Sequence, residues 1–239
     1  MRFAATALIL GLASRTGRAS CPVVAGATAA LGARDDDARL AWIQGRLART
    51  SHRATVWLRT WEIGIVGATA LDLAFIPILG DTRSNRIDFG LGAATTIVGV
   101  VPLIFWQPRV LDDHDELDAS VARGGVDRCA LVAEGERRLI ASADAQHQQR
   151  AWYMHAGNVM LNLGVTLLFG AFHHWTSGVL NGIGGALVGE LIIYTEPVDQ
   201  ISDLERYRHG ELAASPHPSW QLTPIADPHG AGLGFAVQF

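Results

Sequence analysis

The sequence predicts an all-α membrane protein in which four transmembrane helices form two tandem hairpins, each preceded by an amphipathic helix, with a short C-terminal tail like a β-hairpin. Residues 151–189 contain no Asp, Glu, Lys or Arg, and a polar break at 173–177 divides them into two apolar segments. Each segment is near the roughly 20 residues that an α-helix needs to cross a bilayer. A second charge-free run covers 89–108, and 49% of all residues are apolar. Together these observations favour a membrane protein over a soluble one.

The charged residues indicate the source of the chain more than its chemistry. All 19 basic residues are arginine, and abundant Ala and Gly without Lys are typical of a GC-rich bacterial genome. The formal net charge of -4 is too small to indicate a nucleic-acid partner. The two cysteines cannot form a disulfide framework, so they leave the redox compartment open. No cofactor is expected.

The N-terminus, residues 1–25, has the pattern of an export signal. A weakly basic start precedes an apolar run at 3–13, which is too short to span a bilayer but typical of a secretory signal peptide. Cleavage is expected within 20–33. Cys21 suggests an alternative, a lipoprotein signal in which this cysteine is acylated, but Arg18 occupies the position where that signal prefers Leu.

Residues 34–110 form the first predicted unit. Three carboxylates at 35–37 begin an amphipathic helix, because acidic side chains near the first turn stabilise a helix N-terminus. This helix covers 34–59 and leads into a first span at 57–79, which carries Asp72 well inside its apolar run. An intramembrane carboxylate is costly unless it faces the bundle, water or a partner, or is protonated.

A short acidic connector is predicted at 111–125. Its dense carboxylates suggest a hard cation such as Ca²⁺, but the spacing lacks the glycine turn and the distal Glu of an EF-hand loop, so a solvated segment is the favoured interpretation. The second unit then covers 126–197. It has an amphipathic helix at 126–150, followed by the two spans of the long apolar stretch.

The two units share an order of features. Each has an amphipathic helix with arginines, a tryptophan near the membrane entry, two apolar helices and a following proline. In the second apolar helix of each unit a glycine pair recurs seven residues apart, Gly92 with Gly99 and Gly182 with Gly189. This pattern predicts a duplicated hairpin whose two copies have the same orientation.

Small residues form a stripe on the second apolar helix of each unit. At about 100° per residue they fall on one helix face, and such faces let helix backbones approach closely in lipid. We expect these two helices to pack in the middle of the bundle; an oligomer contact is the alternative. The predicted packing residues are Gly92, Thr96, Gly99, Gly178, Gly182, Gly185 and Gly189.

Two carboxylates in the spans are the candidate functional residues. Asp72 and Glu190 would suit proton coupling or cation transit, because a carboxylate in lipid needs a proton, a cation or a partner. For Glu190 the alternative is a place near the membrane interface, since polar Thr195 follows closely. His173 and His174, in the apical turn, are weak candidates for a transition-metal site because adjacent histidines rarely converge on one ion without further ligands.

The tail, residues 198–239, is predicted to begin with a short polar helix and to end in a β-hairpin. Apolar residues alternate from Leu233 to Phe239, which places them on one face of a strand, and 220–225 could pair with that strand. This alternation ending in Phe resembles the terminal strand of bacterial outer-membrane β-barrel proteins. The resemblance covers the tail alone, and the rest of the sequence lacks the many alternating segments of a barrel, so the barrel fold does not follow.

The distribution of arginine conflicts with the export signal. Both ends and the connector fall on one side of the four predicted spans, and this side holds eleven arginines against two, Arg83 and Arg86, on the other. The positive-inside rule therefore predicts a cytoplasmic location for that side, whereas a cleaved signal predicts the opposite. The eleven are Arg34, Arg39, Arg46, Arg49, Arg53, Arg109, Arg123, Arg128, Arg137, Arg138 and Arg150.

These patterns indicate a multi-pass protein of a bacterial cell membrane, with the inner membrane favoured, surrounded by lipid and by a homo-oligomer or membrane-protein partner. The leading hypothesis is a structural or partner-binding membrane component without catalytic activity, because the common catalytic motifs do not occur in the sequence. The alternatives are a small transporter or channel using Asp72 and Glu190, and a membrane enzyme using His173, His174 and Glu190.

Overall fold

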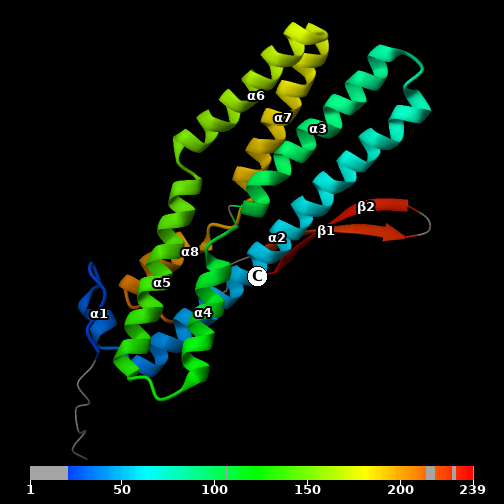
Figure 1. Cartoon of the computed structure of the whole chain (residues 1–239). Coiled ribbons are helices and arrows are strands. Elements are labelled where there is room, and N and C mark those ends of the chain that lie inside the picture. Colours follow the sequence, from blue (N-terminus) through cyan, green and yellow to red (C-terminus); the bar gives the residue numbers. More distant parts are fainter. Residues whose placement is uncertain (1–20, 106, 214–218, 228–229, 239) are drawn as a thin grey trace, which may run out of the picture.

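Figure 1 shows the computed structural model of the chain, which describes residues 21–105, 107–213, 219–227 and 230–238. Most of the predicted export signal lies outside the described residues. The described elements, in chain order, are α1 (Ala29–Gly32), α2 (Asp36–Leu79), α3 (Arg83–Phe105), α4 (Val110–Arg123), α5 (Arg128–Gln149), α6 (Trp152–Phe172), α7 (Trp175–Thr195), α8 (Asp199–Arg208), β1 (Ser219–Asp227) and β2 (Gly230–Gln238).

Four helices are long and apolar enough to cross a membrane, and their apolar segments lie in α2, α3, α6 and α7. Large apolar side chains point outward from these helices; Ile63, Phe105 and Phe172 are 72%, 73% and 84% exposed. Such continuous apolar surface is unfavourable in water and favourable in lipid. The prediction of a multi-pass membrane protein with four spanning helices is therefore confirmed at the level of helix length and composition.

Helix α2 joins two segments that the sequence analysis separates into an amphipathic helix and a span. It runs without a break for 44 residues, which corresponds to about 66 Å at 1.5 Å per residue. The Asp35 side chain caps its start, accepting hydrogen bonds from the backbone N–H groups of Asp37 at 3.1 Å and Ala38 at 3.2 Å. One continuous helix thus extends from a polar domain into the apolar region (Figure 1).

The first half of α2 packs with α1, α4, α5 and α8 into a compact unit, here called the helical domain, in the lower part of Figure 1. Its apolar core is closed to solvent, and α5 approaches α2 closely because Gly135 has no side chain: a Cβ there would lie 3.3 Å from Ile43. The fully buried core residues include Leu31, Leu40, Ile43, Leu47, Leu117, Val132, Leu139 and Tyr207.

The acidic connector expected at 111–125 is helical as far as Arg123 and belongs to the core of the helical domain. Asp113 is 2% exposed and accepts hydrogen bonds from Ser142 Oγ at 2.8 Å and Arg109 Nε at 3.1 Å. Leu117, one turn later, is fully buried. The expectation of a wholly solvated segment is therefore corrected: one face of α4 packs inward because its apolar residues and Asp113 recur at helical spacing.

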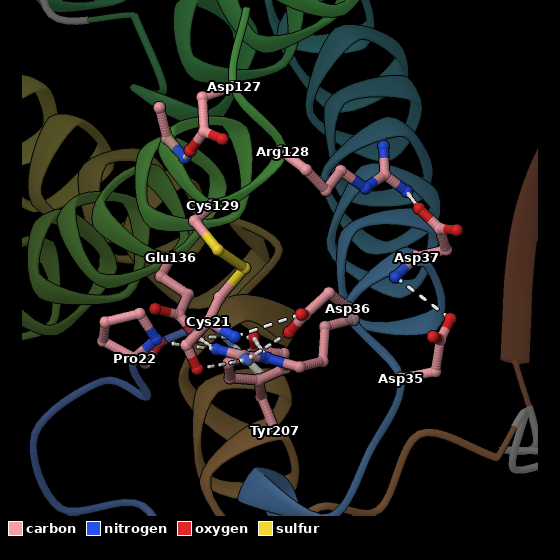
Figure 2. The surroundings of a disulfide bond; sticks show 12 residues. Cys21, Pro22, Asp35, Asp36, Asp37, Asp127, Arg128, Cys129, Glu136 and Tyr207 are labelled. Carbon is pink, nitrogen blue, oxygen red and sulfur yellow. Dashed lines mark hydrogen bonds and ion pairs between the residues drawn. A yellow bond between two sulfur atoms is a disulfide. The ribbon is translucent and has the colours of Figure 1, made fainter. Parts of the chain in front are cut away.

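A disulfide joins Cys21 to Cys129 across 108 residues of sequence (Figure 2). The sequence patterns do not predict this single bond, which forms because the segment from Cys21 folds back onto the start of α5. The backbone N–H of Cys21 also donates to Asp36 Oδ2 at 3.0 Å, which ties the same segment to the first turn of α2.

A buried arginine organises the polar interior of the helical domain. Arg39 is fully buried, and its guanidinium donates to Glu136 Oε1 at 2.7 Å and to the hydroxyl oxygen of Tyr207 at 3.1 Å. It also donates to the carbonyl oxygens of Cys21 and Pro22, at 3.1 and 3.0 Å. Tyr207 in turn donates to Glu136 at 2.6 Å, so α2, α5, α8 and the N-terminal segment meet at one charge (Figure 2).

The spanning helices pack as pairs, α2 with α3 and α6 with α7, and α3 lies beside α7. At the end near the helical domain, Thr195 Oγ1 accepts hydrogen bonds from the indole N–H groups of Trp57 and Trp61, at 3.1 and 3.0 Å. At the far end, His173 Nε2 lies 3.0 Å from Asp88 Oδ1. In the tail, β1 and β2 pair antiparallel, with Ser219 opposite Gln238 and Asp227 opposite Gly230.

We expect Arg39→Leu to lower the free energy of unfolding by about 3–5 kcal/mol, because the Glu136 carboxylate would remain buried without its cation. The measurement is denaturant unfolding of the detergent-solubilised protein followed by circular dichroism. Adding Glu136→Leu should recover part of the loss. Arg137→Leu is the control, since the Arg137 side chain is 72% exposed. If Arg39→Leu and Arg137→Leu lowered the free energy of unfolding equally, the buried ion pair would not be the cause.

Candidate functional site in the membrane-spanning helices

The glycine stripe of α7 lies against α6. A Cβ added at Gly182 would overlap Thr166, one at Gly185 would overlap Asn162, and one at Gly189 would overlap Asn158. Gly178 approaches the backbone of α6 itself, where a Cβ would be 2.5 Å from the Thr166 carbonyl oxygen. The polar side chains of α6 thus occupy space that side chains on α7 would need.

A row of polar side chains on α6, of which Asn158 bonds α7 directly, lies inside the apolar segment. Asn158 Nδ2 donates to the Ala186 carbonyl at 2.9 Å and to Glu190 Oε1 at 3.0 Å. Asn162 Nδ2 donates to Asn158 Oδ1 at 2.9 Å, and Thr166 Oγ1 donates to the Asn162 carbonyl at 3.0 Å. These bonds satisfy polar groups that lipid cannot, so we call the row Asn158, Asn162, Thr166 and the facing glycines the polar seam.

Glu190 ends the polar seam on the side of the helical domain. Its Oε2 lies 2.6 Å from His155 Nδ1, and the two side chains are 27% and 26% exposed. The His155 ring is 5.3 Å from the ring of Tyr194. Glu190 stands five residues before the end of α7, about 8 Å along the axis, which places it near one end of the span rather than at its centre.

Asp72 occupies a different place, between α2 and α3. Its carboxyl lies against Gly92, where a Cβ would be 2.9 Å from Asp72 Oδ2. One turn away, Thr69 Oγ1 donates to Thr96 Oγ1 at 2.9 Å. Gly92 and Thr96 therefore line the contact between α2 and α3, whereas a Cβ at Gly99 would have open space around it.

The two candidate carboxylates have different neighbours. Glu190 is bonded to His155 and Asn158 of α6, and Asp72 packs on Gly92 of α3. Within the described part of the chain, Asp72 forms no side-chain hydrogen bond or ion pair. Among the described residues Glu190 therefore has hydrogen-bond partners for its carboxylate, whereas Asp72 has none.

In the turn between α6 and α7, His173 contacts a carboxylate of α3. His173 bonds Asp88 of α3, and the His173 and His174 rings contact each other at a tilt of 54°, with 4.4 Å between their centroids. Among the described residues, the one cluster of three potential metal-binding side chains is Cys21, Asp36 and Cys129. Its two sulfur atoms are joined in the disulfide and are not thiolates, which are the form that binds metal.

A junction that the sequence analysis does not single out connects the spans to the helical domain. Arg150 Nη2 donates to the carbonyl oxygens of Tyr194 and Glu196, at 2.8 and 3.1 Å, and so satisfies the free end of α7. Glu196 is 9% exposed, although it directly follows the span. Gln146 accepts from the backbone N–H of Gln200 at 3.0 Å, which fixes the start of α8.

Comparison of the chain with protein-family models, with curated proteins and with solved structures gave no match.

The spacing of polar and small residues in the sequence also indicates the polar seam. Asn158, Asn162, Thr166 and Gly170 recur every four residues on α6, and the glycines of α7 recur every three or four, so each set lies along one helix face. Two matching repeats on consecutive spans joined by a short turn indicate that the spans face each other. The spacing of the glycines in α7 therefore predicts that their face packs against the preceding helix, α6.

We expect Gly185→Leu to destabilise the α6–α7 pair by about 1–3 kcal/mol, because the new side chain would displace Asn162 from the polar seam. Gly184→Leu is the matched control, since a Cβ at Gly184 meets no atom within 4 Å. Thermal unfolding in detergent, followed by circular dichroism, compares the two. Equal unfolding temperatures would show that the seam does not hold the helices together.

Proposed function

We propose that this chain is a non-catalytic membrane component of a bacterial cell envelope, which binds a further membrane helix and holds its helical domain at the membrane surface. The polar groups of the seam support a structural role, because Asn158 bonds the backbone and Glu190 of α7, and Asn162 bonds Asn158. The closed core of the helical domain and the unbroken course of α2 support the second part of the proposal, since they fix the domain to a span.

The position of Asp72 inside the apolar segment of α2 is the observation that supports partner binding. The residue lies seven positions before Leu79, about 10 Å from the end of α2 along the axis, within the apolar segment. Its side chain is only partly buried, and it has no hydrogen bond or ion pair within the described residues. A carboxyl group at this depth is costly in lipid, so a hydrogen-bond donor or cation on a partner helix would stabilise it.

The proposal also covers the duplication of the hairpin, the choice of membrane and the identity of the partner. The two helix pairs are tandem copies of one hairpin unit, each entered through an amphipathic helix, and the tail adds a β-hairpin. The chain resides in the inner membrane, where helical spans are the common solution to backbone hydrogen bonding in lipid. The partner is a second copy of the chain or another membrane protein.

We expect the protein purified in a mild detergent to run as a complex, either a homo-oligomer or an assembly with one defined membrane protein. Asp72→Leu should dissociate it, because the polar contact of the partner would be lost, and Asp72→Asn should retain part of it. Light scattering coupled to size exclusion measures the mass, and Asp81→Leu in the exposed turn is the control. A wild-type protein that is monomeric and has no partner would overturn the proposal.

A second candidate function is a small proton- or cation-coupled transporter or channel, favoured by the short His155–Glu190 contact near one end of the span. In this case Glu190→Gln and Asp72→Asn should each abolish ion flux into proteoliposomes, because each removes a group that can exchange a proton. Asp88→Asn, outside the apolar segments, is the control. Flux that both substitutions leave unchanged would remove the two carboxylates from any transport mechanism.

A further inference from the structure

The folded helical domain includes Cys21, which lies within the export signal predicted at residues 1–25. Cys21 is 4% exposed and Leu31 is fully buried. The backbone of Cys21 both donates to Asp36 and accepts from Arg39, and its sulfur is bonded to Cys129 (Figure 2). Cleavage after Cys21 would remove the disulfide and two hydrogen bonds of the Cys21 backbone, so we infer that the folded chain retains Cys21.

The disulfide also specifies the compartment. Disulfides form and persist in oxidising compartments outside the bacterial cytoplasm and are rare inside it. Cys129 begins α5, which packs with α2, α4 and α8 in one domain, so the whole helical domain shares that compartment. Four spans are consistent with this arrangement, because an even number returns the chain to the same side.

The arginines that favour the opposite orientation are held inside the fold of this domain. Arg39, Arg46 and Arg138 are buried or nearly so and pair with carboxylates of other helices. The first apolar segment of a chain usually sets its topology, and an export signal would send the domain across the membrane. The two arginines of the opposite turn, Arg83 and Arg86, would then be cytoplasmic, as the positive-inside rule requires for a short loop.

We propose that the signal is cleaved between Ala19 and Ser20, and that the mature chain folds outside the cytoplasm, where Cys21 is oxidised to a disulfide with Cys129. Gly17 and Ala19 are the small residues that signal peptidase requires three positions and one position before the cleaved bond. Acylation of Cys21 is incompatible with this state, because a lipid thioether and the disulfide need the same sulfur atom. The inference does not depend on the partner proposed above.

The mature state is reached in two covalent steps, cleavage of a peptide bond and oxidation of two thiols. Water adds across the Ala19–Ser20 peptide bond, leaving a carboxylate on Ala19 and an amine on Ser20. The thiols of Cys21 and Cys129 then pass two electrons and two protons to the disulfide of an extracytoplasmic thiol oxidoreductase, which leaves as a dithiol. Asp36 and Arg39 hold the Cys21 backbone while its sulfur faces the start of α5.

The first test is the intact mass of the full-length gene product, purified from bacterial membranes without reductant. We expect a chain that begins at Ser20, is two hydrogen atoms lighter than its reduced form, and takes up a maleimide only after reduction. Ala19→Tyr should block cleavage and leave the longer chain. A mass that includes the first nineteen residues, a lipid on Cys21 or two free thiols in the wild-type protein would overturn the proposal.

The second test reports the side of the membrane and does not require the disulfide. In the Cys21→Ser variant, Cys129 should react with a membrane-impermeant maleimide on spheroplasts after mild denaturation of the exposed domain. A cysteine introduced by Ser84→Cys in a chain without the native cysteines should react only after lysis. The reverse pattern would place the helical domain in the cytoplasm and exclude the disulfide in the cell.

Discussion

Helix α2 runs without a break from the water-exposed helical domain into the lipid bilayer, so one backbone must be stable in both environments. Its first half buries Leu40, Ile43 and Leu47 in the core of the helical domain, and its second half turns residues such as Ile63 outward. An α-helix can make this transition because all its backbone hydrogen bonds are internal, so the change of environment costs nothing in the main chain. Only the side chains change, from a buried apolar face in the domain to apolar groups on the outside of the span.

The polar groups are distributed according to the same constraint. In the helical domain the fully buried charge of Arg39 is met by several partners, among them Glu136 and Tyr207. In the spans Asn158 bonds the adjacent helix α7 and Asn162 bonds Asn158, and missing side chains on α7 leave room for both. Asp72 departs from this pattern, and the proposed partner helix would supply what the chain itself does not.

Local patterns in the sequence predict the spans but not their neighbours. The charge-free runs identify α3, α6 and α7 directly, because the cost of burying charge in lipid acts on each helix separately. The sequence predicts that α3 and α7 pack in the middle of the bundle. In the structure α3 lies beside α7, but the glycines of α7 lie against α6, since packing depends on the complementary side chains of the opposite helix. The Cys21–Cys129 bond joins residues 108 apart, and two cysteines carry no spacing signal over such a distance.

Thr195 sets the vertical register between the two helix pairs. Its single hydroxyl oxygen accepts from both Trp57 and Trp61, and these indoles project from successive turns of α2. If α7 slid by one turn relative to α2, both donors would lose their acceptor at once, in a layer where amphipathic rings already prefer one depth. The hydrogen bonds of Thr195 therefore hold the α6–α7 pair at the same depth in the bilayer as the α2–α3 pair.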